Sequence, residues 1–63
     1  LEQHLQNKAE LHYRKGVTYF VSEKYDKAVK EWNEALRLNP EHPRAKKDLD
    51  KANRLLDRLK ALQ

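Results

Sequence analysis

The chain has 63 residues, enough for one small domain whose core can bury only a modest apolar surface. It contains no cysteine, which excludes disulfides and cysteine-based metal sites, and no apolar run approaches the ~18 residues that a membrane span needs. Lysine and arginine outnumber aspartate and glutamate by 14 to 10, and this net charge of +4 allows an acidic partner without identifying one.

The first predicted helix spans residues 3–22, and the scarcity of glycine and proline favours such long helices. Its amino-terminal half offers only Leu1, Leu5 and Ala9 as apolar residues. Its carboxy-terminal half is apolar on more than one side, through Leu11, Tyr13, Val17, Tyr19, Phe20 and Val21. A helix that is apolar on two sides needs two partners, or one partner and a ligand.

The second predicted helix spans residues 25–38 and has the clearest periodicity. Its apolar residues recur every three or four positions and share one face: Tyr25, Ala28, Val29, Trp32, Ala35 and Leu36. The sequence Asn39-Pro40 ends this helix, because the residue before a proline is driven out of the α region. This pattern predicts a helix with one face on the core and the other in solvent.

The third predicted helix spans residues 43–62 and starts at Pro43, since proline is favourable at the first helical position. Its apolar stripe consists of Ala45, Leu49, Ala52, Leu56 and Leu59, and Leu55 and Leu62 widen it. Such a broad stripe is typical of a helix that faces a core. A coiled-coil seam is the alternative, but the run is short for one and two of its positions are alanine.

Gly16 lies inside the first predicted helix, where glycine costs ~1 kcal/mol relative to alanine. Glycine is tolerated there when another backbone comes close, and the apolar face of the second helix offers the small residues Ala28 and Ala35. The two-residue link Glu23-Lys24 makes the two helices antiparallel. We therefore predict an all-α fold with a tight helix-turn-helix hairpin and a third helix.

The hairpin resembles the tetratricopeptide repeat. Five residues stand at the separations of that repeat's signature: Gly16, Tyr19, Ala28, Trp32 and Pro40. The similar stretch runs from Ala9 to His42 and has the full 34-residue length of one repeat. His12 and Lys15 depart from the signature, because they replace an aromatic residue and a leucine. The resemblance implies an antiparallel hairpin of the alpha-alpha superhelix type.

The third helix does not continue the repeat, because Asp50 and Asn53 stand where the signature has glycine and tyrosine. It is similar to the polar-backed capping helix that closes repeat arrays. We expect a single domain at 1–63, with the repeat at 9–42, the cap at 43–63 and the chain a fragment of a longer protein. Since about three repeats are usually needed to bury a continuous core, a second copy, upstream repeats or a peptide should cover the first helix.

In proteins that resemble this one, the first helices of the repeats line a concave groove that binds peptides. The resemblance places six residues in that groove: Glu10, Tyr13, Arg14, Val17, Phe20 and Val21. Tyr13, Val17 and Phe20 form one stripe at helical spacing. The predicted function is therefore a protein-interaction or assembly module that binds a protein, a peptide or a second copy of itself through this apolar face. A purely structural end-cap of a longer repeat array is the alternative.

The sequence predicts no enzymatic activity and no metal or other cofactor. Ser22 has no histidine at motif spacing, and there is no glycine-rich phosphate loop. His4 and His12 are too far apart for a one-turn metal site, and His42 is expected to cap or pack at the turn before Pro43. The basic third helix leaves weak nucleic-acid binding as an alternative, but it has no aromatic residue for base stacking. We expect a soluble domain and leave its compartment open.

Overall fold

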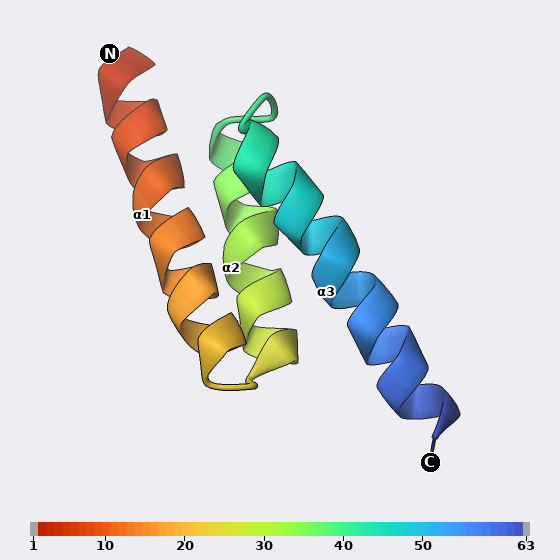
Figure 1. Ribbon diagram of the computed structural model, residues 1–63. Coiled ribbons are helices and arrows are strands. Elements are labelled where there is room, and N and C mark those ends of the chain that lie inside the picture. Colours follow the sequence, from red (N-terminus) through yellow and green to blue (C-terminus); the bar gives the residue numbers. More distant parts are fainter. Residues whose placement is uncertain (1, 63) are drawn as a thin grey trace.

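The computed structural model describes residues 2–62, with side-chain surroundings for residues 7–62, and this part of the chain forms three helices. Helix α1 spans Glu2–Val21, α2 spans Tyr25–Leu38 and α3 spans Pro43–Ala61 (Figure 1). Every boundary falls within one residue of its predicted position, and the all-α class is confirmed. Leu1 lies outside the described residues, and His4 and Leu5 lie outside the described side chains.

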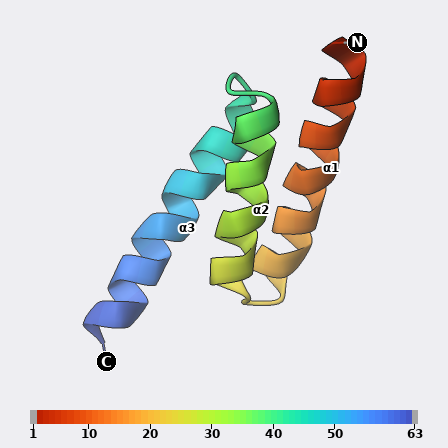
Figure 2. The ribbon, with the colours of Figure 1, turned by 180° about the vertical axis from the view of Figure 1, so that it is seen from behind.

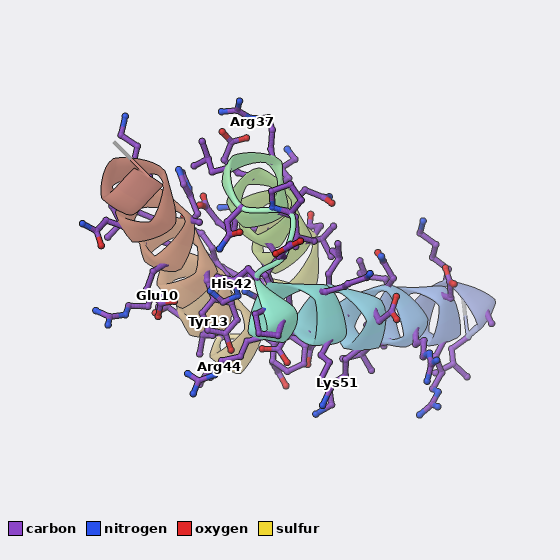
Figure 3. The ribbon with its side chains drawn as sticks, turned by 90° about the horizontal axis from the view of Figure 1, so that it is seen from above. Glu10, Tyr13, Arg37, His42, Arg44 and Lys51 are labelled. Atoms are coloured by element: carbon purple, nitrogen blue, oxygen red, sulfur yellow. The ribbon has the colours of Figure 1, made fainter. Side chains whose placement is uncertain are left out.

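The helices form a hairpin with a third helix packed against one of its arms. Helices α1 and α2 are antiparallel neighbours, and α3 turns back along α2 and then diverges from the hairpin (Figures 1 and 2). Viewed from above, α1 lies on the left, α2 at the top centre, and α3 extends to the right (Figure 3).

The turn between α1 and α2 ends α1 with a Schellman motif. The Lys24 N–H donates to the Tyr19 carbonyl at 2.8 Å, and the Glu23 N–H donates to the Phe20 carbonyl at 3.0 Å. The motif requires a left-handed residue, usually glycine, and Glu23 adopts that conformation with a φ of 64°. A non-glycine residue costs roughly 1–2 kcal/mol in that region. The link holds residues 22–24, one more than predicted, because α1 ends at Val21.

The link between α2 and α3 is organised by Asn39 and His42. The Asn39 side-chain oxygen accepts a hydrogen bond from the Glu41 N–H at 3.3 Å. His42 caps α3, because its Nδ1 accepts a hydrogen bond from the Ala45 N–H at 3.1 Å, as a serine or aspartate oxygen usually does. Since Nδ1 accepts this bond, the imidazole is neutral and carries its proton on Nε2. The predicted capping role of His42 is therefore confirmed.

The core consists of one tryptophan surrounded by small residues. Trp32 is 1% exposed, and it is the only large side chain that is fully buried in the described part of the chain. The other buried hydrophobic residues there are all alanines: Ala9, Ala28, Ala35, Ala45 and Ala52. The Trp32 Nε1 donates to the backbone carbonyl of Tyr13 at 3.0 Å, so the buried indole has its polar atom satisfied.

Gly16 is buried directly against the Trp32 ring. A Cβ atom at Gly16 would lie 2.3 Å from Trp32 Nε1 and 2.5 Å from Trp32 Cδ1, distances that no real Cβ contact tolerates. The predicted tight contact at Gly16 is therefore present, but its nearest partner is an indole rather than the backbone beside Ala28 and Ala35. The alanines contribute by letting the helices approach closely enough for one side chain to fill the core.

The apolar stripe of α3 is buried only over its first half. Ala45 and Ala52 are buried and Leu49 packs against the core, whereas Leu59 is 40% and Leu62 is 79% exposed. The prediction of a core-facing stripe along all of α3 is therefore wrong for its last turn, whereas Leu55 and Leu56 are half-buried. Helix α3 has 19 residues and α2 has 14, so the end of α3 runs past the helix that covers it (Figure 1).

Candidate interaction groove

A row of aromatic rings follows the hairpin and fixes its apolar face in place. Successive ring centroids along the row lie between 4.9 and 6.2 Å apart, in the order His42, Tyr13, Trp32, Phe20, Tyr25. Offset and tilted rings at such distances attract one another beyond the area they bury. Three of these rings, Tyr13, Phe20 and Tyr25, are only partly buried, so a surface with fixed geometry remains accessible beside the core.

Two adjoining cavities form a groove between α1 and α3. The smaller has a volume of about 150 Å³ and is lined by Tyr13, Val17, Phe20, Trp32, Asp48 and Lys51. The larger has a volume of about 650 Å³ and is lined by Phe20, Lys47, Asp48, Asp50, Lys51, Arg54, Leu55 and Arg58. Phe20, Asp48 and Lys51 line both cavities, so the two are continuous. We call this surface the α1–α3 groove.

The two walls of the α1–α3 groove differ in chemistry. The α1 wall is apolar, because Tyr13, Val17 and Phe20 pack against the core cluster and keep part of their surface exposed. The α3 wall is charged, and Figure 3 shows Lys51 projecting from α3 on the side away from α2. This wall carries four cations and two carboxylates: Lys47, Lys51, Arg54, Arg58, Asp48 and Asp50. A ligand in the groove would therefore meet an apolar and a cationic surface at once.

The structure brings together three of the six residues that the resemblance places in a groove. Tyr13, Val17 and Phe20 line the smaller cavity side by side. Within the described side chains, the other three, Glu10, Arg14 and Val21, line neither cavity. Glu10 bonds to His42, whereas the Arg14 side chain and Val21 are each 76% exposed on the flank of α1.

Tyr13 joins the two walls of the groove. Its hydroxyl donates a hydrogen bond to Oδ2 of Asp48 on α3 at 2.6 Å. Burial of the phenol, followed by its hydrogen bond to Asp48, raises the pKa of Tyr13 from 10.0 to about 12. The protonated phenol is therefore the form that makes this hydrogen bond between α1 and α3.

We expect the link between Tyr13 and Asp48 to make the domain less stable at alkaline pH. An unfolded Tyr13 ionises near pH 10, before the folded one does, so the free energy of unfolding falls as the pH rises from 10.0 towards about 12. Tyr13→Phe removes this contribution, so urea melts of the variant should lose less stability over that range than those of the parent. The control is Tyr19→Phe, which should follow the parent, and equal alkaline losses in Tyr13→Phe and the parent would refute the link.

A second contact between α1 and the start of α3 pairs Glu10 with His42. The His42 Nε2–H donates to Oε1 of Glu10 at 2.9 Å, and Arg14 approaches the other carboxylate oxygen at 3.3 Å. The hydrogen bond from His42 is the main cause that lowers the pKa of Glu10. A lowered carboxyl pKa adds stability above the unfolded value, and this stability is lost as the pH falls through the folded value. Glu10 therefore stabilises the contact between α1 and the first residues of α3.

The remaining histidine of the described side chains stabilises the hairpin from its other side. His12 stands at the position where the repeat signature has an aromatic residue. Its Nδ1 lies 2.7 Å from Oε1 of Glu31 on α2. A polar contact between α1 and α2 thus replaces the apolar one that the departure at His12 removes. Among the side chains of residues 7–62, no group of three histidine, aspartate or glutamate residues is placed to hold a metal ion. No helix in the described part of the chain is long and apolar enough to cross a membrane.

The sequence predictions missed the residues on the α3 wall of the groove. A signal for them exists, because Lys47, Lys51 and Arg54 stand 34 residues after Tyr13, Val17 and Phe20. That offset is the length of one repeat, so these residues occupy on α3 the places that the apolar stripe occupies on α1. The interpretation of α3 as a cap does not predict a charged groove wall, because a cap is expected to present its polar residues to solvent.

Comparison with known families supports the hairpin assignment. The family model described as tetratricopeptide repeat matches residues 9–42, the same stretch that the signature spacing indicates. The match covers more than half of the chain, and it indicates a repeat module and no catalytic family. No curated protein and no solved structure matched the chain.

Proposed function

Because this chain belongs to the tetratricopeptide repeat family, we propose that it binds a protein segment in the α1–α3 groove. Repeats of this kind present extended concave surfaces that mediate protein–protein interaction. The observation that supports the proposal is the partly buried row of Tyr13, Val17 and Phe20, which borders a cavity that α3 lines on its other side without filling it. Pockets that bind ligands are concave and largely apolar, with a few polar groups that fix orientation.

The side chains of this apolar wall are held in fixed positions, and this favours binding of a partner. Phe20 contacts the rings of both Trp32 and Tyr25, and Tyr13 is fixed by its bond to Asp48. A partner that docks on side chains already held in position loses little of its binding energy to ordering them. We therefore assign Phe20 as the central contact, because it is the only α1 residue that lines both cavities.

The test is a selection of peptides from a random display library on the immobilised chain, followed by affinity measurements with two variants. Phe20→Ala should weaken the selected peptides by about tenfold or more, since a buried aromatic contact carries much of the energy of an interface. Val21→Ala is the matched control, because this neighbouring residue lines neither cavity and should leave affinity unchanged. Peptides that bind Phe20→Ala as tightly as the parent, with its helical circular dichroism retained, would place binding elsewhere.

Self-association is a second candidate, and three exposed apolar side chains favour it. Val21 is 76% and Leu11 is 54% exposed on α1, and Leu62 is 79% exposed at the end of α3. A neighbouring repeat or a second copy could cover such side chains in a repeat array. Light scattering over a range of concentrations decides this case, since a constant monomer mass would eliminate self-association and leave the groove proposal intact.

A further inference from the structure

We propose that the segment bound in the α1–α3 groove is acidic and amphipathic, with apolar side chains against Phe20 and Leu55 and carboxylates against the cations of α3. This inference rests on the proposed function and adds the charge of the partner. It is drawn from the lining of the larger cavity, where Phe20 and Leu55 are the apolar residues and four of the remaining six are lysine or arginine. A ligand that satisfies both surfaces needs apolar and anionic groups close together.

The cations of the α3 wall lack partners within the described part of the protein. The salt bridges there join other residues, namely Arg14 with Glu10 and Arg37 with Glu34, and the hydrogen bonds of His12 and His42 go to Glu31 and Glu10. Asp48 and Asp50 offset part of this charge, so the wall keeps an excess of two positive charges (four cations against two carboxylates). Unpaired cations beside an apolar cavity favour the approach of carboxylates and oppose that of cationic segments.

The spacing of the four cations sets the length of the complementary segment. Lys47, Lys51, Arg54 and Arg58 recur every three or four residues, so they lie along one side of α3. Lys47 and Arg58 stand eleven positions apart, which corresponds to about 16 Å of helix at 1.5 Å per residue. An extended peptide covers that length with about five residues. We therefore expect several carboxylates within a short segment rather than one isolated acidic group.

Charge distribution disfavours a second copy of this chain in the groove. Residues 1–42 carry seven acidic and seven basic residues, so that part offers no excess of carboxylates to the cationic wall. Residues 43–63 carry seven basic and three acidic residues, so pairing α3 with α3 would bring like charges together. A separate acidic partner avoids both mismatches.

The experiment uses synthetic fluorescent peptides and measures binding to the full chain by fluorescence anisotropy. The first peptide alternates leucines with glutamates, the second replaces each glutamate by glutamine, and the third replaces each by lysine. We expect the acidic peptide to bind about tenfold more tightly than the neutral one and the basic peptide not to bind. High salt should abolish the difference between the acidic and neutral peptides, because it screens exposed charges.

Two charge reversals locate the effect. Lys51→Glu changes the one cation that lines both cavities and should weaken the acidic peptide by about tenfold without weakening the neutral one. Lys30→Glu changes the net charge equally on the exposed face of α2, lines neither cavity and should have no such effect. Equal losses in both variants would show a response to net charge alone and would overturn the inference.

The remaining outcomes separate failure of this inference from failure of the proposed function. If all three peptides bind equally and Phe20→Ala releases them, the groove binds peptides but does not select charge, and only the inference fails. If Phe20→Ala leaves the acidic peptide bound, the groove is not the site, and both fail. Displacement of the acidic peptide by a single-stranded oligonucleotide at equal charge concentration would indicate a general anion surface and would also overturn the inference.

Discussion

Replacing Trp32 with alanine is expected to unfold this domain. Trp32 is 1% exposed and is the only large side chain in a core otherwise made of alanines, so no neighbour can close the cavity left behind. Truncating a buried tryptophan typically costs about 3–5 kcal/mol, and a domain this small rarely has more than ~3–5 kcal/mol to lose. Far-UV circular dichroism should therefore show loss of helix at room temperature, without denaturant.

Two further variants test whether the loss of stability in Trp32→Ala comes from the lost packing of the indole in the core. Trp32→Phe keeps a ring against Gly16 and removes the hydrogen bond from Nε1 to the Tyr13 carbonyl, so it should leave a folded but weaker domain. Asn33→Ala changes the exposed neighbour on α2 and should melt like the parent. A cooperative melt of Trp32→Ala at the parental temperature would show that the hairpin does not depend on this side chain.

Replacing Gly16 with alanine should destabilise the domain, although the same change inside a helix usually stabilises it. Helix propensity favours alanine by ~1 kcal/mol. The new Cβ would meet Trp32 Nε1 at 2.3 Å, and relieving such overpacking typically costs about 1–3 kcal/mol, so the steric cost exceeds the gain. Urea denaturation should show a lower midpoint with an unchanged slope.

The direction of the stability change in Gly16→Ala shows whether the contact with Trp32 or the helix propensity of alanine dominates. Lys15→Ala is the matched control, because this exposed neighbour on α1 gains or loses only propensity and should stay close to the parent. Gly16→Leu should be worse than Gly16→Ala, since its longer side chain extends further into the indole. An increase in stability for Gly16→Ala would contradict the packing of the glycine against Trp32.

The helices and the hairpin were predictable because local signals determine them. Proline at residues 40 and 43 fixes the end of α2 and the start of α3, and the apolar periodicity of α2 identifies Trp32 as a core residue. The glycine at residue 16 indicated a close contact, although its partner is an indole and not a backbone. A spacing pattern identifies small positions but does not show which large side chain fills the space beside them.

The groove was only half predictable, because its α3 wall depends on tertiary packing. The stripe of Tyr13, Val17 and Phe20 is a periodic signal within one helix, and the structure places those three residues together. Whether Lys51 faces them or solvent depends on the angle at which α3 crosses α2, and no local pattern encodes that angle. The same holds for Leu59, which fits the apolar stripe but lies beyond the end of its partner helix.

The position of Trp32 gives the molecule a built-in optical reporter. The chain has a single tryptophan, and this residue bonds to α1, belongs to α2 and packs with Ala52 of α3. It also borders the smaller cavity of the groove, so its emission responds both to a peptide placed there and to the departure of α3. One intrinsic fluorophore therefore follows folding, docking of the third helix and occupancy of the groove, with no label attached.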